Sequence, residues 1–462
     1  MPELAPAPET IDAAAQLRRR LDTTEATIGV VGLGYVGLPL AAEYAAKGFE
    51  TRGIDLDEDR VRRLNAGENY VEDLDDAAIE GLVEMGRLRA TPHYEEGEEV
   101  DVWFLCVPTP VTETNEPDPS YIEAATRSIA PHLRPGQLVV LKSTTYPGTT
   151  EEVVAPILEE EGPDDLTLGE DVFLAFSPER IDPGNDEYTT ANTPVVAGGM
   201  TEACTDMARR ALEQIIADVH TVSDPKVAEM EKLLENIFRS VNIALANELA
   251  QLCERIDDLS IWEVVDAAAT KPFGFMPFYP GPGVGGHCIP IDPYYLSSVA
   301  KTHDFETSFI TLSAQVNEEM PRHVVDAVVE AIAREPVRLQ DAEVLVLGVA
   351  FKGNVSDTRR SPADEIVRLL REKGVGQIRY SDPHVEAYAA PGEGEGRKEV
   401  PAVDLTPEVL RQHEATVIVT DHDAFDPALI AEHAPAIVDT RNALVGIEDP
   451  ALREKITLLG AG

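Results

Sequence analysis

The feature that most constrains the fold is a glycine motif between a predicted strand and a predicted helix. Thr27–Val31 is an apolar run typical of a buried strand, and Leu38–Lys47 has a helical composition that ends at Gly48. A second strand is predicted over Thr51–Asp55, which ends in an acid. Between the first strand and the helix lie three glycines spaced as G-x-G-x-x-G: Gly32, Gly34 and Gly37. This order of elements predicts a dinucleotide-binding βαβ unit near the start of the chain.

The same unit predicts which nucleotide binds. Glycines let the backbone approach a pyrophosphate at a helix N-terminus, where free N–H groups and the helix dipole favour anions. Asp55 lies 18 residues after Gly37, where it can accept hydrogen bonds from the adenine ribose and repel a 2′-phosphate. We therefore expect NAD rather than NADP, with the nearby Arg52 and Arg60 softening that preference. The alternative is a glycine turn that only packs a helix on a strand.

Alternating strands and helices continue to about residue 222 and then stop. Four more apolar segments are predicted strands: Val102–Val107, Leu138–Lys142, Val172–Phe176 and Pro194–Ala197. Their alternation with helical segments predicts a parallel sheet with helices on both faces. From Asp224 to about Ile256 the sequence predicts one long helix, which starts with Pro in its first turn. A helix over Ser260–Thr270, a Gly- and Pro-rich loop over Lys271–Pro290 and helices over Phe309–Arg334 are expected to follow.

A second α/β region begins near Ala342. It contains a predicted helix near Pro362–Lys373 and four predicted strands: Val344–Leu347, Ile378–Ser381, Ala415–Thr420 and Ala436–Val438. The fold class is therefore α/β, with two Rossmann-like domains on either side of an all-helical one. We expect an acidic N-terminal arm over residues 1–26, followed by domains over residues 27–222, 223–330 and 331–462.

The charge of the chain excludes several classes of partner. There are 84 acidic and 38 basic residues, which gives a formal net charge of −46. Nucleic acids and anionic membranes attract basic surfaces, so we expect neither as a partner. The longest apolar runs are too short to span a bilayer, and Met1–Thr10 lacks the features of a signal peptide, which predicts a cytoplasmic protein. Only 10 of the basic residues are Lys, which favours a halophilic protein over an acidic mesophilic one.

Cysteine usage points to one segment of the chain. The four cysteines, Cys106, Cys204, Cys253 and Cys288, have no metal-ligand spacing, so no metal site is predicted. Cys288 lies in the Gly- and Pro-dense segment Gly281–Asp292, which suggests backbone moulded around a ligand. Cys288 and Asp292 are a candidate nucleophile and base, and His287 could lower the pKa of the thiol. For each cysteine, a small buried hydrophobic residue is the alternative.

Two further groups of polar residues have the spacing of binding sites. Lys232 and Asn236 are four residues apart on the long helix, so they share a face and could stabilise an oxyanion. A solvated face on which Glu229 pairs with Lys232 is the alternative. Three basic residues lie between a strand and a helix start, which suits phosphate binding: Lys352, Arg359 and Arg360. Ion pairs at the helix start are the alternative there.

Taken together, these segments resemble the UDP-sugar 6-dehydrogenase family, which includes UDP-glucose, UDP-N-acetylglucosamine and UDP-N-acetylmannosamine dehydrogenases. The resemblance covers about residues 27–445. It rests on motifs in a fixed order: GVVGLGYVGLPLA, FLCVPTP, KSTTYPGTT, AFSPERIDPG, EKLLENIFRSVNIALANELA, PGPGVGGHCIPIDP and GVAFKGNVSDTRRSP. It implies an N-terminal NAD-binding Rossmann domain, a central helical dimerisation domain, a C-terminal UDP-binding domain and a homodimer.

The resemblance also implies a chemistry and its residues. The family removes four electrons from the sugar with two NAD, so that the C6 alcohol becomes an aldehyde, a cysteine thioester and finally an acid. Cys288 matches the nucleophile, and Lys232 and Asn236 match the pair that stabilises anions. Asp292 matches the water-handling acid. Two further residues match those that position water or act as acid and base: Thr144 and Glu179.

Binding residues are implied in the same way. The residues that match the family's NAD contacts are Gly32, Gly34, Tyr35, Val36, Gly37, Asp55, Arg60, Pro108, Thr109 and Thr144. The residues that match its UDP-sugar contacts are Glu179, Arg180, Lys232, Asn236, Gly285, Phe351, Lys352 and Arg359. Asp439 and Arg441 are expected at the nucleotide edge of the last domain.

Departures from the UDP-glucose branch indicate which sugar is used. That branch has Ser and Lys where this chain has His287 and Ile291, and a second Glu where this chain has Pro183. The forms present here look like the N-acetylhexosamine branch. We therefore favour UDP-N-acetylglucosamine over UDP-N-acetylmannosamine, and either over UDP-glucose. Two competing hypotheses are a two-electron hydroxyacid dehydrogenase and a nucleotide-sugar sensor without turnover.

Overall fold

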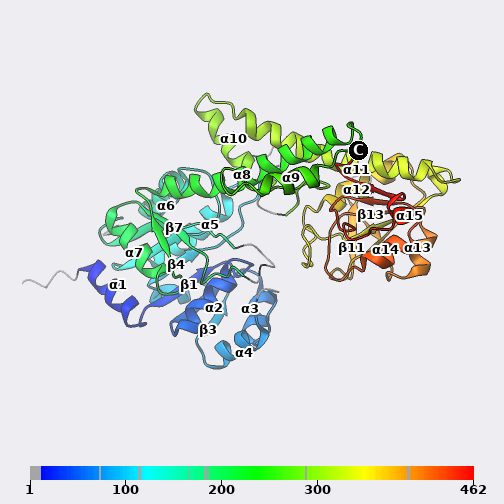
Figure 1. Cartoon of the computed structure of the whole chain (residues 1–462). Coiled ribbons are helices and arrows are strands. Elements are labelled where there is room, and N and C mark those ends of the chain that lie inside the picture. Colours follow the sequence, from blue (N-terminus) through cyan, green and yellow to red (C-terminus); the bar gives the residue numbers. More distant parts are fainter. Residues whose placement is uncertain are drawn as a thin grey trace, which may run out of the picture. The chain divides into compact units, whose positions relative to one another are not determined.

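The computed structural model describes residues 12–71, 74–112, 116–164, 166–181, 185, 187–286, 289–392 and 396–462, apart from the side chains of residues 96–98. The chain divides into two compact units, Met1–Leu234 and Glu235–Gly462 (Figure 1). The boundary between them falls within one long helix, α8 (Pro225–Cys253).

The first unit is built on a sheet of eight described strands in the order β3-β2-β1-β4-β5-β6-β7-β8. The strands are β1 (Thr27–Val31), β2 (Glu50–Ile54), β3 (Leu88–Thr91), β4 (Val102–Leu105), β5 (Gln137–Leu141), β6 (Val172–Phe176), β7 (Val195–Gly199) and β8 (Val219–Thr221). The sequence therefore identified β1, β2, β4, β5, β6 and β7 to within two residues. Along the sheet, the strand order reverses between β1 and β4. Ligands of such sheets bind just beyond the carboxyl ends of the strands at that point.

One pairing in this sheet differs from the parallel arrangement expected. β6 and β7 are antiparallel, with Ala175 opposite Gly199 and Phe176 opposite Gly198. A parallel connection needs a crossover, usually a helix, and no helix is described between these two strands. The other pairs of this sheet are parallel.

Helices cover both faces of the first sheet and make two separate cores. The helices are α1 (Ala13–Asp22), α2 (Gly37–Lys47), α3 (Glu58–Asn65), α4 (Asp76–Glu84), α5 (Ser120–Ile129), α6 (Ala155–Glu161) and α7 (Glu202–Leu212). Short helical turns are η1 (Tyr94–Glu99), η2 (Ala130–His132) and η3 (Thr150–Val154). Val30 packs with α2 and α7, whereas the next residue of β1, Val31, packs with α5 and α6. This alternation is what a two-sided parallel sheet requires.

The N-terminal segment packs on the first unit through one helix. α1 lies within the arm expected over residues 1–26, contacts α7 and buries Leu17 and Leu21 in the core of the sheet. Arg18 also pairs with Asp206 of α7 at 3.2 Å. The described part of this segment is therefore integral to the first unit, because its apolar face needs a partner. Residues 1–11 lie outside the described residues.

The second unit begins with the rest of α8 and three more helices: α9 (Ile261–Ala269), α10 (Asp292–Thr302) and α11 (Ser308–Ala333). The segment from Lys271 to Gly286 contains no helix or strand, as expected for its glycines and prolines. α10 was not predicted. It begins at Asp292, directly after the loop, with Pro293 in the first turn, where proline suits a helix.

The rest of the second unit is a five-stranded parallel sheet in the order β10-β9-β13-β14-β15 among the described residues. Its strands are β9 (Glu343–Leu347), β10 (Gln377–Ser381), β13 (Ala415–Ile418), β14 (Ile437–Asp439) and β15 (Ile456–Leu458), and β11 (Tyr388–Pro391) pairs with β12 (Arg397–Val400). Its helical elements are η4 (Leu339–Asp341), α12 (Pro362–Lys373), α13 (Pro407–Gln412), α14 (Pro427–His433) and α15 (Pro450–Arg453). α11 and α12 cover one face, and α13 and α14 cover the other.

Among the described helices, none combines the length and the apolar character that crossing a membrane requires.

Candidate functional site

The glycine motif forms a turn in which two of the three glycines are sterically required. Gly32 has a φ of +88°, and a Cβ there would lie 2.6 Å from the carbonyl oxygen of Cys106. A Cβ on Gly37 would lie 1.8 Å from the carbonyl oxygen of Gly32. Gly34 faces open space instead. The turn thus fits a pyrophosphate, because its closed side packs on β4 and its open side leaves the backbone accessible at the start of α2.

Asp55 directly follows β2 and is fixed against the glycine turn. Its Oδ2 accepts a hydrogen bond from the N–H of Leu33 at 2.8 Å, and its Oδ1 accepts one from the N–H of Asp57 at 2.9 Å. Arg60 contacts the same carboxylate at 3.4 Å. Each oxygen keeps acceptor capacity for a ribose hydroxyl. The buried Arg52 pairs instead with Glu50 and Glu99, so only Arg60 of the two arginines touches Asp55.

The other residues expected to contact NAD lie along the same edge of the sheet. Tyr35 and Val36 directly precede α2, Pro108 and Thr109 follow β4, and Thr144 follows β5. β1, β4 and β5 are adjacent and parallel, so these loops emerge side by side. The structure thus brings together the residues that the sequence placed in three separate motifs.

Glu179 follows β6, the next strand along this edge, and is held by a lysine that the sequence analysis did not single out. Lys142 has no exposed side-chain surface, and its Nζ lies 3.2 Å from Glu179 Oε2 and donates to the carbonyl of Pro178 at 3.3 Å. Glu179 Oε1 accepts hydrogen bonds from the N–H groups of Arg180 and Ile181. Arg180 in turn pairs with Glu231 of α8. Lys142 ends an otherwise apolar run, and a lysine in that position is the sequence feature that could have identified it.

Glu229 plays a different part from the one considered in the sequence analysis. Its buried carboxylate accepts hydrogen bonds from the N–H of Gly148 at 2.6 Å, and from the N–H and hydroxyl of Thr150 at 2.9 and 2.6 Å. Burial raises the pKa of Glu229, and these hydrogen bonds oppose that rise. Glu229 therefore ties α8 to the loop that carries Thr144, and it is not the partner of Lys232. Lys232 is itself only 9% exposed, so the solvated helix face is wrong.

In the second unit, two of the expected catalytic residues are in direct contact. Asn236 Nδ2 donates a hydrogen bond to Asp292 Oδ2 at 2.5 Å. Asn236 lies on α8, and the buried Asp292 is the first residue of α10. His287 and Cys288 lie outside the described residues. In sequence, Cys288 precedes Asp292 by four residues.

The three cysteines that the structure describes are poor candidates for a nucleophile. Cys204 is buried in the first turn of α7, and its sulfur accepts a hydrogen bond from the N–H of Leu174 at 3.4 Å. Cys253 is buried against α9, where burial raises the pKa of its thiol. Burial raises the pKa of Cys106 to about 12, although the nearby Lys142 opposes the rise. A neutral thiol is a weak nucleophile and Cys204 has no exposed surface, so none of the three suits covalent catalysis.

The glycine-rich loop lies directly on the loop that follows β9. A Cβ on Gly285 would lie 2.8 Å from Phe351 Cβ and 2.9 Å from the carbonyl oxygen of Arg360. The N–H of Gly286 donates to the carbonyl of Arg359 at 3.3 Å. The loop that leads to Cys288 therefore touches the segment that carries Lys352, and glycines are required for this close approach.

Two arginines of this region have different environments. Arg359 is exposed and pairs with Asp357 at 2.6 Å, which is the ion pair considered as the alternative to phosphate binding. Arg441 follows β14 and lies against the glycine-rich loop, since a Cβ on Gly281 would be 2.7 Å from its Nη1. Burial lowers the pKa of Arg441 to about 10, although Asp421 and Asp439 oppose the shift, so the guanidinium stays charged at neutral pH. Arg441 is thus a partly buried cation beside the loop.

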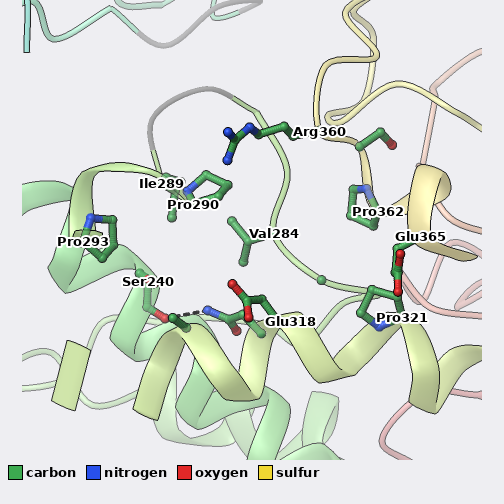
Figure 2. A pocket seen from close by; sticks show the side chains of 14 residues that line it. Ser240, Val284, Ile289, Pro290, Pro293, Glu318, Pro321, Arg360, Pro362 and Glu365 are labelled. Carbon is green, nitrogen blue, oxygen red and sulfur yellow. Dashed lines mark hydrogen bonds between the residues drawn. The ribbon is translucent and has the colours of Figure 1, made fainter. Parts of the chain in front are cut away.

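A cavity of about 410 Å³ is lined in part by residues that flank Cys288 in the sequence (Figure 2). Val284 precedes Cys288 in the chain, and Ile289 and Pro290 follow it. Figure 2 shows Arg360 and Glu318 approaching the cavity from opposite sides. Its size falls within the range of small-molecule sites, which is about 300–1,000 Å³.

Within the described ranges, no group of three or more His, Cys, Asp or Glu side chains is arranged to hold a metal ion.

Comparison with known proteins matches three successive parts of the chain to one family. Residues 26–216 match the NAD binding domain of the UDP-glucose/GDP-mannose dehydrogenase family, residues 226–319 match its central domain, and residues 345–446 match its UDP binding domain.

Individual relatives carry the names of three different sugars. The chain is 36% identical over 414 residues to an NDP-N-acetyl-D-galactosaminuronic acid dehydrogenase of Ralstonia solanacearum, covering 88% of this chain and 93% of the relative. It is 37% identical over 364 residues to a UDP-N-acetyl-D-glucosamine 6-dehydrogenase of Pseudomonas aeruginosa, covering 79% and 84%. Its fold is similar to the solved structure of a UDP-D-ManNAc dehydrogenase from Pyrococcus horikoshii, with a TM-score of 0.83, 32% identity and coverage of 94% and 99%.

Proposed function

Because the chain belongs to the UDP-glucose/GDP-mannose dehydrogenase family and is an NAD-dependent UDP-sugar dehydrogenase, we propose that it oxidises the C6 hydroxyl of a UDP-N-acetylhexosamine to a carboxylate. The proposal includes a covalent intermediate on Cys288. The observation that carries it is the hydrogen bond between Asn236 and Asp292, which pairs an anion-stabilising amide with a carboxylate four residues from Cys288.

The fit of the glycine turn to NAD rests on its shape and on Asp55. The turn leaves Gly34 open at the start of α2, and Asp55 keeps acceptor capacity beside it. When bound there, NAD supplies the hydride acceptor in each of two oxidation steps. The remaining work falls to side chains that hold the sugar, stabilise charge and handle protons and water.

The proposed reaction runs through four steps at C6: oxidation, thiolate addition, a second oxidation and hydrolysis. Loss of the hydroxyl proton and of a hydride from C6 gives the aldehyde. The Cys288 thiolate then adds to C6, and the resulting alkoxide is stabilised by the Lys232 ammonium and the Asn236 amide. Loss of a second hydride from C6 gives the thioester. Water adds to it, the C–S bond breaks, and the thiolate leaves as the acid forms.

Hydrolysis of the thioester needs groups that position water and accept its proton. In our proposal Asp292 accepts the proton, and Thr144 and Glu179 position the water. Lys142 supports this role, because its ammonium keeps Glu179 paired and oriented. The family's second Glu, replaced here by Pro183, has no part in this scheme; Pro183 lies outside the described residues.

The identity of the sugar is the least constrained part of the proposal. UDP-N-acetylglucosamine and UDP-N-acetylmannosamine differ only in configuration at C2, and the oxidation takes place at C6. We favour UDP-N-acetylglucosamine, as the GGHCIPID and SPERIDPG segments suggest, with UDP-glucose as the alternative. A reaction that consumes NAD and a UDP-sugar also fits the cytoplasmic location that the sequence predicts.

A panel of UDP-sugars tests the proposal. NADH release would be measured with UDP-N-acetylglucosamine, UDP-N-acetylmannosamine, UDP-N-acetylgalactosamine and UDP-glucose, in molar KCl and in dilute buffer. We expect the highest kcat/KM with UDP-N-acetylglucosamine, and activity retained in molar KCl. A preference for UDP-glucose would overturn the assignment to N-acetylhexosamines. If UDP and NAD bind but no NADH is released with any of these sugars, the hypothesis of a nucleotide-sugar sensor without turnover would be favoured.

The role of Asp55 leads to a prediction about the cofactor. Asp55→Ser removes a carboxylate that binds the ribose and repels a 2′-phosphate, while Arg60 remains beside the site. We expect the KM for NAD to rise about tenfold to a hundredfold, the range for losing a hydrogen bond to a charged group, and the KM for NADP to fall. Asp57→Ser is the matched control, because Asp57 caps α3, a role that serine can also fill, and pairs with Arg60 at 3.6 Å. Unchanged KM values in Asp55→Ser would show that Asp55 does not contact the cofactor.

We also propose that the chain forms a homodimer through α8. Large apolar side chains recur every three or four residues along the second half of this helix and remain exposed: Leu245, Leu249 and Leu252. An apolar stripe of this kind is typical of a helix that packs against another helix. Light scattering should give twice the chain mass of 50.2 kDa, and Leu252→Arg should give the mass of one chain. A single-chain mass for the unmodified protein would contradict the proposal.

A further inference from the structure

The loop that carries Lys352 is held by two side chains from neighbouring strands. Asp382 follows β10 and His422 follows β13, on either side of β9. His422 Nε2 lies 3.1 Å from Asp382 Oδ2, and neither side chain has any exposed surface. The N–H of Asn354 donates to His422 Nδ1 at 3.0 Å. Asp382 Oδ2 also accepts the N–H of Val349 at 2.7 Å.

These contacts assign the protonation of the two buried groups. Because Nδ1 of His422 accepts a backbone N–H, its proton lies on Nε2, which donates to Asp382. Burial alone would raise the pKa of Asp382, but hydrogen bonds from His422, Val349 and His384 outweigh it and lower that pKa. A neutral imidazole thus connects a carboxylate to the backbone of the Lys352 loop.

The turn that His422 holds has an unfavourable backbone conformation. Asn354 has a φ of +62°, which is uncommon for a residue other than glycine. Its side chain is clamped to Asp423, since Nδ2 donates to Asp423 Oδ2 at 2.9 Å and Oδ1 accepts the N–H of Asp423 at 3.0 Å. A Cβ on Gly353 would lie 2.3 Å from the carbonyl oxygen of Asp421. The shape of residues 351–354 therefore depends on the segment that contains His422.

Comparison with the first unit shows what is unusual about this arrangement. Asp55 and Asp382 both follow the strand next to the first strand of their sheet, and both accept an N–H from the loop after that first strand. Asp55 contacts only an arginine and backbone N–H groups among the described residues, which leaves it able to meet a ribose. Asp382 is covered by His422. Asp382 in the second unit thus shapes a loop, whereas Asp55 in the first unit is accessible to a ligand.

We propose that His422 is a positioning residue for the UDP part of the substrate. By accepting the N–H of Asn354, it holds the turn of residues 351–354 so that Lys352 meets the diphosphate. The inference rests on the proposed function and on the UDP-sugar contact that the resemblance implies for Lys352. It does not involve the reacting carbon, so it predicts an effect on UDP-sugar affinity and not on the chemical steps.

Two substitutions separate the two hydrogen bonds of His422. In His422→Asn, Oδ1 takes the place of Nδ1 and keeps an acceptor for the N–H of Asn354. In His422→Gln, the amide reaches the place of Nε2 and keeps the bond to Asp382 but leaves that N–H without its acceptor. The Kd for UDP would be measured by calorimetry, together with kcat and the KM values for UDP-sugar and NAD.

We expect His422→Gln to raise the Kd for UDP and the KM for UDP-sugar about tenfold, the scale of leaving a buried N–H unpaired. The kcat and the KM for NAD should stay within about twofold, and His422→Asn should stay close to the unmodified protein. Equal effects of the two variants, or the reverse order, would overturn the proposal. Lys352→Ala checks its premise: if Lys352→Ala weakens UDP binding and His422→Gln does not, only the role of His422 is wrong. If Lys352→Ala leaves UDP binding unchanged, the proposed UDP site itself is wrong.

Discussion

Replacing Cys288 by serine should abolish formation of the uronic acid, with a fall in kcat of at least about 10³-fold. A serine hydroxyl is not ionised at neutral pH, so it adds slowly to the aldehyde, and a serine alkoxide leaves the acyl carbon less readily than a thiolate does. The first hydride transfer does not need the thiol. We therefore expect a burst of at most one NADH per site, with the aldehyde accumulating, as mass spectrometry of the UDP-sugar would show.

Cys253→Ala is the control for this experiment. Cys253 is buried in the helical region against α9, and its thiol is not part of the proposed site. The Cys253→Ala substitution should therefore lower the stability of the protein without changing the stoichiometry of the reaction. Full acid production by Cys288→Ser would mean that no covalent intermediate forms on Cys288. The chain would then be a dehydrogenase of a different mechanism.

Replacing Lys232 by methionine should lower kcat by about 10²-fold or more. Its ammonium is proposed to stabilise the alkoxide that forms when the thiolate adds to C6, and the loss of one such donor costs about 10²–10³ in kcat. Methionine keeps the length and the buried apolar part of the side chain, so the packing of α8 should change little. Stopped-flow measurement of NADH would show whether both hydride transfers slow.

Lys226→Met provides a matched control on the same helix. Lys226 lies in the first turn of α8, where it pairs with Glu151 and Glu152, and its side chain is 44% exposed. The two substitutions make the same chemical change on the same helix, but only Lys232 is buried. We expect Lys226→Met to have less than a twofold effect on kcat. Equal rates for the two variants would mean that Lys232 has only a structural role.

The elements that could be predicted from sequence are those defined by local pattern. β1, the glycine turn and α2 follow from an apolar run, three glycines and a helical segment that ends at Gly48, which caps α2 in the left-handed conformation. α8 was predicted almost to its ends for the same reason. The antiparallel pairing of β7 with β6 was not predicted, because strand direction depends on how residues far apart in sequence meet. α10 was missed because the prolines and glycines before Asp292 indicate a loop that continues.

The candidate site shows the same division between local and distant information. Lys232 and Asn236 could be placed on one helix face from their spacing alone. Glu229 also lies near Lys232 in sequence, but its hydrogen bonds go to Gly148 and Thr150, about 80 residues earlier in the chain. Lys142 and His422 were missed because their partners, Glu179 and Asp382, are distant in sequence. Each of these contacts exists only once the sheet edges have formed.

The net charge of −46 is compatible with an enzyme that binds anionic ligands, because the groups proposed to bind them are confined to two places in the chain. The glycine turn leaves its backbone open at Gly34 just before α2, and Arg441 is a partly buried cation beside the glycine-rich loop. Contacts of this kind are screened by salt far less than exposed charges are. Substrate binding should therefore not depend on long-range attraction to the surface.

The most direct test of the proposed mechanism is the number of NADH molecules released for each UDP-sugar consumed. The measurement would use the UDP-sugar with the highest kcat/KM, a limiting amount of it, excess NAD, and chromatography of the product. The four-electron mechanism predicts two NADH and one UDP-uronic acid for each UDP-sugar. One NADH for each UDP-sugar, with an aldehyde or ketone as the final product, would contradict it.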